Sequence, residues 1–249
     1  MEDKLRYQEL KEQLKNAGCD VDMDICNTKG FIFPRKYDYI LCKYLGAFKN
    51  HGFNSNIIHC LAQPKKYSMI PVLLREFYNA NVPAFTFDYY RWYLGDGLYK
   101  IGYKDDFFYD YIKISSNVQY GESRQMVVLL LGRSKREEAL DKLIDIMNNW
   151  DYDVLKETLS ALSSFKSERV YDEVKLFSEK LISEKGKKKF TEDMYAVSSQ
   201  LHKNYTDNEK KRYVQEMYTE VIMRVNKILK RHDSEIPKDR RKLFKKISK

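Results

Sequence analysis

Glycine and proline are scarce in this chain, which has 10 Gly and 5 Pro among 249 residues. β-Sandwiches and Rossmann folds need many tight turns, and those turns draw on both residue types. The apolar fraction of 43% is still enough to build a hydrophobic core. The composition therefore favours helices joined by short polar links.

Cysteine is also sparse, and the four residues all lie in the first quarter of the chain without a CxxC pair: Cys19, Cys26, Cys42 and Cys60. Most have apolar neighbours, so we expect buried free thiols in a reducing cytosol. The charged, helical N-terminus MEDKLRYQELKEQLK does not resemble a signal peptide. No apolar run approaches the roughly 18 residues of a membrane span. These features predict a soluble cytoplasmic protein.

Metal-binding motifs are missing as well. The four histidines never occur at i, i+4 spacing, and neither HExxH nor a Cys/His knuckle is present. The stretch from Asp20 to Asp24 begins like a calcium loop. Ile25 stands where that loop needs Gly, and Phe31 stands where it needs Glu. We therefore expect no metal ion.

The sequence also lacks the usual signatures of cofactor chemistry and catalysis. Gly95, Gly97 and Gly102 do not form GxGxxG after a strand, and GxxxxGK[ST] does not occur. No Ser or Cys nucleophile has a His at a familiar spacing. We expect no cofactor and a protein that is not an enzyme.

The positive charge of the chain is concentrated in its last quarter. The net charge is +9, yet residues 1–184 hold 26 Lys/Arg against 27 Asp/Glu. Residues 185–249 hold 19 Lys/Arg against 9 Asp/Glu. This asymmetry predicts a nearly neutral body over residues 1–184 and a basic appendage over residues 185–249.

Helical periodicity recurs along the whole chain. One stripe consists of Leu140, Leu143, Ile144 and Met147, and another of Val170, Val174, Phe177 and Leu181. Such steps of three and four mark one face of an amphipathic helix. No stretch sustains a period of two, so the sequence predicts an all-α protein built from helical hairpins.

The hairpins repeat at a nearly constant period. Similar phrases end the second helices: GLYKI at 97–101, LLGRS at 130–134 and ALSSF at 161–165. Equivalent leucines at positions 61, 98, 131 and 162 are 37, 33 and 31 residues apart. A period of two helices is typical of a solenoid, in which each hairpin buries its apolar face on its neighbours.

Two arginines strengthen this interpretation. Arg91 precedes Leu98 by seven positions, and Arg124 precedes Leu131 by the same distance. With the phrases RWYLGDGL from Arg91 and YGESRQM from Tyr120, residues 35–183 resemble bacterial HEAT-repeat proteins. The resemblance implies a HEAT-type α-solenoid of about four hairpins, with an N-terminal capping helix.

The arginine pattern is incomplete. In the first and last repeats, the residue seven positions before the equivalent leucine is Asn54 and Leu155. We expect Arg124 to pair with a carboxylate of its own or the next hairpin, and the polar residues before it to start a helix rather than form an active site.

The appendage has the signals of a further helical hairpin. KGKKK at 185–189 predicts a polar break, and Thr206 to Glu209 has capping-box spacing. A wide apolar stripe from Val214 to Leu229 must be buried, as an end cap or a dimer contact. The final stretch from Pro237 is basic, as a short helix or a tail. Its candidate nucleic-acid contacts are Lys238, Arg240, Arg241, Lys242, Lys245 and Lys246. An acidic protein partner or a membrane surface would fit the same basic run equally well.

One constellation could carry chemistry. Trp92 and Asp96 lie four residues apart on one helix face, and Arg124 lies on the equivalent helix of the next repeat. The three resemble the aromatic, carboxylate and arginine cluster of AlkD-like alkylpurine DNA glycosylases. That resemblance implies that Asp96 would stabilise positive charge on the sugar, with an aromatic contact to the nucleotide from Trp92 and a phosphate contact from Arg124. The alternative is that Trp92 is core and Asp96 pairs with a neighbouring helix.

The leading functional prediction is a non-enzymatic scaffold that holds a protein or peptide on its concave face. Aromatic and Arg side chains dominate interface energetics, and the chain has 20 tyrosines. The predicted partner-binding residues are Tyr89, Tyr90, Trp92, Asp96 and Arg124. A nucleic-acid-binding protein, including a glycosylase, and an immunity-type protein that neutralises a toxin remain alternatives.

Overall fold

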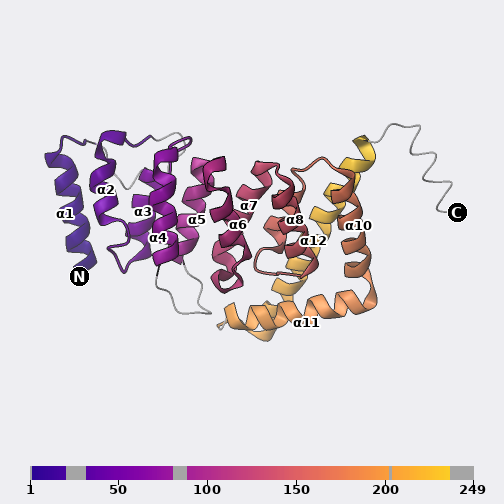
Figure 1. Ribbon diagram of the computed structural model, residues 1–249. Helices are drawn as coiled ribbons and strands as arrows, with labels where there is room; N and C mark the ends of the chain where they lie inside the picture. Colours follow the sequence, from indigo (N-terminus) through magenta and orange to yellow (C-terminus); the bar gives the residue numbers. More distant parts are fainter. Residues whose placement is uncertain (1, 21–31, 81–88, 202–203, 236–249) are drawn as a thin grey trace. The chain divides into compact units, whose positions relative to one another are not determined.

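Every regular element that the structure describes is a helix (Figure 1). The structure is a computed structural model, and it describes residues 2–20, 32–80, 89–201 and 204–235. Within these ranges no residue is in a strand, so the all-α prediction is confirmed. No helix in them is both long enough and apolar enough to cross a membrane.

The chain forms two compact units, Met1–Leu130 and Leu131–Lys249. The sequence-predicted boundary after residue 184 falls inside the second unit, and α7 (Gln125–Ser134) contains the transition between the two. The basic appendage is thus one part of a larger unit that begins within α7.

In the first unit, helices that follow one another along the chain pack together in pairs. Its α-helices are α1 (Glu2–Asn16), α2 (Asp38–Tyr44), α3 (His51–Leu61), α4 (Ile70–Asn79), α5 (Tyr89–Ile101) and α6 (Phe108–Ser116). Short 3₁₀ turns lead into three of them: η2 (Arg35–Tyr37), η3 (Tyr67–Met69) and η4 (Asp105–Phe107). A longer 3₁₀ segment, η5 (Val118–Arg124), precedes α7. Helix α5 packs against both α3 and α4, while α2 packs against α1 and α3.

Local sequence signals set the starts of these helices. The Asn50 side chain accepts a hydrogen bond from the Gly52 N–H and caps α3. Pro71 occupies the first turn of α4, where its missing N–H costs nothing. Both devices leave the apolar faces of the helices free to form the core of this unit.

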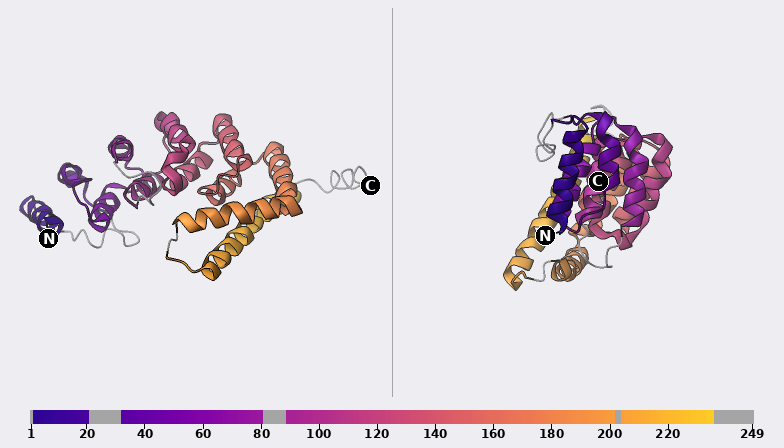
Figure 2. Two further views of the ribbon diagram at one scale, coloured as in Figure 1. Left: turned by 90° about the horizontal axis from the view of Figure 1, so that it is seen from below. Right: turned by 90° about the vertical axis from the view of Figure 1, so that its left-hand side faces the viewer.

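The described part of the second unit contains five further helices. They are α8 (Glu137–Asn148), α9 (Leu155–Leu162), α10 (Glu168–Ile182), α11 (Glu184–Leu201) and α12 (Asp207–Glu235). Helices α8 and α9 pack as a hairpin, and so do α11 and α12 (Figure 2). Helix α12 also packs against α9 and α10.

The apolar stripe of α12 is covered by its own unit. Val214, Val221, Val225 and Ile228 are all buried in the chain. The predicted capping box is present at the start of α12. The backbone N–H and the hydroxyl of Thr206 both donate to the Glu209 carboxylate, and the Glu209 backbone N–H donates to the Thr206 hydroxyl. Helices of the same chain therefore cover this part of the predicted stripe, whereas Met217, Tyr218, Ile222 and Leu229 are half-buried.

The predicted polar break at 185–189 is wrong, because α11 begins at Glu184 and runs through it. Gly186 makes this possible at the sharp corner after α10. A Cβ atom at this position would lie 1.8 Å from the Lys180 carbonyl oxygen. The glycine thus permits a close approach of two helix ends, a role that composition alone does not reveal.

The prediction of free thiols is corrected at one position. Cys19 and Cys42 are free, whereas Cys60 is disulfide-bonded. Cys26 lies outside the described residues. Cysteine usage therefore no longer argues for a reducing compartment.

Candidate functional site

Arg124 is a structural residue of the first unit. Its side chain is 0% exposed. The guanidinium donates from Nε to the Gly121 carbonyl at 2.9 Å and from Nη1 to the Ser115 carbonyl at 3.1 Å. Ser115 lies in the last turn of α6, whose final carbonyls have no partner within the helix. Arg124 therefore satisfies backbone carbonyls at the end of α6 and in the turn before α7.

Arg91 has the same role one hairpin earlier. Its Nε donates to the Phe77 carbonyl at 3.1 Å and its Nη2 to the Ala80 carbonyl, at the end of α4. The guanidinium also lies over the Tyr120 ring, 4.7 Å from the ring centre. Asn54, at the equivalent position of the preceding hairpin, donates to the Phe48 carbonyl at 2.7 Å. All three side chains thus fix the backbone that precedes their own helix.

The glycines of the RWYLGDGL phrase have packing roles. A Cβ atom on Gly95 would lie 3.1 Å from the Ser123 carbonyl oxygen, and one on Gly97 would lie 2.8 Å from Ile58. Both glycines allow neighbouring helices to approach α5 closely. They do not form a phosphate-binding loop.

The five residues predicted to bind a partner differ in how exposed they are. Tyr89 is 54% exposed and Trp92 is half-buried. Tyr90 is only 8% exposed, and its hydroxyl donates to Glu76 at 3.4 Å. Asp96 is 9% exposed, and Arg124 is wholly buried. The interior position of Arg124 keeps its guanidinium away from any surface that Trp92 and Asp96 share.

A different set of side chains lies together on α3 and α5. We call it the α3–α5 cluster, and it consists of His59, Trp92, Tyr93, Asp96 and Lys100. The Lys100 ammonium is 2.9 Å from Asp96 and 3.0 Å from His59 Nδ1. The Tyr93 ring makes edge-to-face contacts with Trp92 at 5.6 Å and with His59 at 6.2 Å. Two aromatic rings, one carboxylate, one ammonium and one imidazole therefore form a continuous network.

Trp92 is also held from a neighbouring helix. Its indole Nε1 donates to the Gln125 side chain at 3.3 Å, at the start of α7. A half-buried indole with its N–H satisfied keeps one orientation and leaves part of its ring exposed. The cluster is thus ordered before any partner arrives.

The protonation of His59 is set by its surroundings. Burial, and then the nearby Lys100 charge, lower the pKa of His59 from its ordinary 6.5 to about 4, against a smaller opposing effect of Asp96. The imidazole is therefore neutral at pH 7. Because Nδ1 accepts from Lys100, Nε2 carries the remaining proton and can donate to a ligand.

This low pKa predicts an acid-sensitive contribution to stability. An unfolded His takes up its proton near pH 6.5, whereas folded His59 stays neutral down to about pH 4, so acidification across this interval favours unfolding. We expect wild type to lose about 1 kcal/mol more unfolding free energy than His59→Gln between pH 7.5 and pH 4.5, a figure reduced for solvent screening. Urea titrations at both pH values measure this difference. Equal losses in the two proteins would contradict it.

Sequence patterns missed three members of the cluster. Lys100 follows Asp96 by four residues, so its helix pairing was available from spacing alone. Tyr93 and His59 had no such signal, because their proximity depends on how α3 packs on α5.

The chemistry of the cluster is that of paired charges and aromatic rings. Asp96 is paired with Lys100, and the interactions of the cluster include no activated nucleophile. Among the described residues, no three His, Cys, Asp or Glu side chains are grouped so that they could hold a metal ion. Searches of protein families, of curated proteins and of solved structures find no match to this chain.

Proposed function

We propose that the protein is a HEAT-type binding scaffold and that a protein or peptide docks on the α3–α5 cluster. The observation that carries this proposal is the combination of half-exposed aromatic rings with donors and acceptors that are already oriented. Aromatic side chains held in one conformation lose little entropy on binding, so they contribute strongly to affinity.

The charge of the cluster favours a protein partner. Asp96 and Lys100 neutralise one another, and His59 is neutral at pH 7. A neutral surface with mixed donors and acceptors suits peptide groups, whereas a phosphate backbone requires an excess of positive charge. The nearby Tyr89 ring extends the aromatic surface at the start of α5.

The HEAT-type assignment rests on the repeated role of one position. Asn54, Arg91 and Arg124 each precede an equivalent leucine by seven residues, and each donates to backbone carbonyls before its own helix. A residue that performs one task in successive hairpins supports a repeat architecture. Leu155 lacks this function, as expected for an atypical terminal repeat.

The docking proposal predicts a strong effect at Trp92. We expect Trp92→Ala to weaken partner binding at least about tenfold, because truncation of a buried aromatic anchor costs about 2 kcal/mol or more. The matched control is Tyr109→Ala on α6, which removes an aromatic ring that is 70% exposed and belongs to a helix outside the cluster. Affinity capture from nuclease-treated native lysate, quantified by mass spectrometry, provides the measurement.

The two variants separate specific from general effects. Selective loss of one discrete protein with Trp92→Ala supports docking on the cluster. The proposal fails if the Trp92→Ala variant still captures every protein that wild type captures. It also fails if the Tyr109→Ala variant loses the same proteins. An immunity-type role would be one case of the same scaffold, with a toxin as the captured protein.

The glycosylase alternative receives no structural support. It requires Arg124 to reach a phosphate beside Trp92 and Asp96, whereas the Arg124 side chain is buried on backbone carbonyls. The predicted nucleic-acid contacts from Lys238 to Lys246 lie outside the described residues.

A further inference from the structure

Basic residues of the second unit fall into two groups. Some on α11 and on the first half of α12 pair with a carboxylate four residues further along the helix: Lys188 with Glu192, Lys189 with Asp193 and Arg212 with Glu216. Lys180, Lys185 and Lys211 have no such partner among the described residues, and Lys135, Lys166, Lys227 and Lys230 belong with them. Among the residues that the structure describes, none of these four ammonium groups forms an ion pair. Their charge is therefore available to an outside partner.

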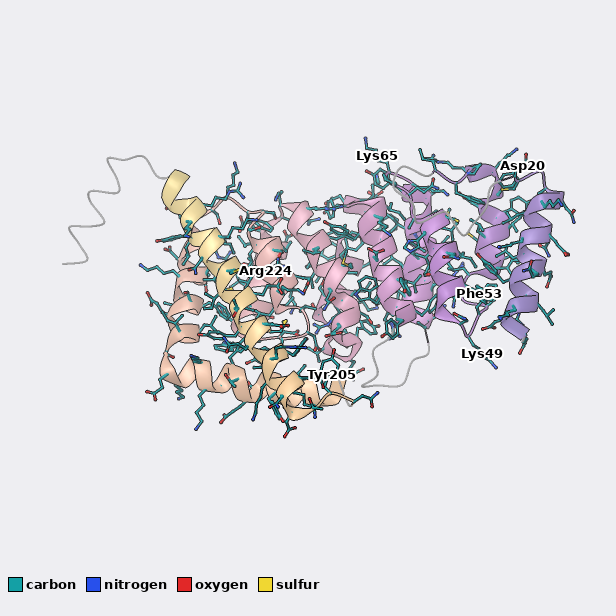
Figure 3. The ribbon with its side chains drawn as sticks, turned by 180° about the vertical axis from the view of Figure 1, so that it is seen from behind. Asp20, Lys49, Phe53, Lys65, Tyr205 and Arg224 are labelled. Atoms are coloured by element: carbon teal, nitrogen blue, oxygen red, sulfur yellow. The ribbon has the colours of Figure 1, made fainter. Side chains whose placement is uncertain are left out.

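The segments that carry these four lysines meet at the C-terminal end of α9. Helix α12 runs alongside α9 in the same direction, since Glu220 pairs with Lys156 at 3.8 Å and Arg224, which is labelled in Figure 3, bonds to the Ser160 hydroxyl. Further along, Arg231 donates to the Ser163 carbonyl at 2.9 Å. Arg231 therefore lies at the last turn of α9, and Lys227 and Lys230 are its neighbours on α12.

Two more lysines reach this end from other segments. Lys135, in the turn between α7 and α8, donates to the Ser164 carbonyl. Lys166 follows Ser164 by two residues, in the link to α10. We call this group the α9-end cluster, which consists of Lys135, Lys166, Lys227, Lys230 and Arg231.

The cluster carries more positive charge than the end of one helix requires. A helix C-terminus presents about half a negative charge, whereas the segments that meet at this one carry five cations, two of which donate to its last carbonyls or to those just after it. Burial, and then the Arg231 charge, lower the pKa of Lys135 from its ordinary value, so like charges act on each other here. Lys135 also has φ of 59°, a conformation that costs a non-glycine residue about 1 kcal/mol. Stability alone does not account for this arrangement.

We propose that the α9-end cluster binds the phosphodiester backbone of a nucleic acid. Its cations come from three separate segments and extend along α12, as a chain of regularly spaced phosphates requires. A membrane surface would also call for exposed apolar side chains. Among the large apolar residues exposed in the described part of this unit, only Met223 lies within one helical turn of the cluster.

The sequence that follows α12 has the same sign of charge. Residues 236–249 hold 7 Lys/Arg and 1 Asp/Glu. This second binding surface is independent of the α3–α5 cluster, because it belongs to the other unit and has a different charge character. Either surface can fail its test without affecting the other.

The test compares two lysine triplets in the full chain. One variant carries Lys166→Gln, Lys227→Gln and Lys230→Gln. The control carries Lys180→Gln, Lys185→Gln and Lys211→Gln, three exposed lysines elsewhere in the same unit. Both lose the same net charge. Fluorescence anisotropy with a labelled 20-base-pair DNA duplex and a labelled single-stranded RNA is measured from 50 to 200 mM salt, after circular dichroism confirms equal helicity.

We expect the cluster variant to bind at least one of these nucleic acids at least about tenfold more weakly than wild type and to show a shallower salt dependence, by up to about 0.9 per lost phosphate contact. The control should change affinity less than about threefold, and replacement of the three cluster lysines by arginine should preserve binding. Equal weakening in both glutamine variants, no nucleic-acid binding by wild type, or binding to anionic vesicles alone would each overturn the proposal.

Discussion

Replacing Arg124 by methionine is expected to lower the free energy of unfolding by about 3 kcal/mol or more. The substitution fills most of the same volume but removes both donors, and it leaves the Gly121 and Ser115 carbonyls buried without them. A buried polar group that loses its partner costs about 1–3 kcal/mol. Urea unfolding followed by far-ultraviolet circular dichroism measures the loss.

The matched control is Arg75→Met on α4, where the side chain is 62% exposed beside Glu76. Surface pairs of this kind contribute about 0–1 kcal/mol, so this variant should unfold almost as wild type does. Arg124→Lys should recover little stability, because one ammonium group cannot reproduce the forked guanidinium. Similar stability of the Met variant and wild type would show that Arg124 is dispensable.

Gly132→Ala is expected to destabilise the second unit by about 3 kcal/mol. The added Cβ would lie 2.8 Å from the Cα atom of Ala161 and 3.0 Å from its carbonyl oxygen. These are backbone atoms of α9, so a side-chain rotation cannot relieve the contact. Helices α7 and α9 would have to separate and lose packing between them.

Two companion variants test this explanation by thermal and urea unfolding. Gly52→Ala in α3 should be neutral or slightly stabilising, because its closest neighbour is the adaptable Asn50 side chain at 3.1 Å. Adding Ala161→Gly to Gly132→Ala should restore only part of the loss, since the two backbone contacts remain. Full recovery in the double variant would mean that the Cβ contact alone matters.

The helices were predictable because their signals are local. The stripes at 140–147 and 170–181 became α8 and α10, and the spacing from Thr206 to Glu209 produced the cap of α12. Each depends on residues within one or two turns. The lysine-rich segment at 185–189 was wrongly predicted to be a polar break, because its local composition resembles that of a loop. The turn before α11 depends instead on the close approach of Gly186 to the Lys180 carbonyl.

The candidate site was less accessible to sequence reasoning. Periodicity placed Trp92 and Asp96 on one face of α5, but it could not show that Arg124 would bind carbonyls at the end of α6. Tyr90 likewise lies in the interior because α4 supplies Glu76 beside it. How deeply a residue is covered depends on neighbouring helices, and a single sequence does not specify their spacing.

The position of α12 on α9 has a consequence for the order in which the chain acquires its structure. Arg224 and Arg231 contact residues that are 64 and 68 positions earlier. On the ribosome, α9 and α10 would therefore emerge well before the helix that covers them. Their apolar faces stay exposed during that interval, which invites non-native association. Synthesis through Arg231 thus becomes the step that completes the second unit, and slow translation near its end would prolong its vulnerable period.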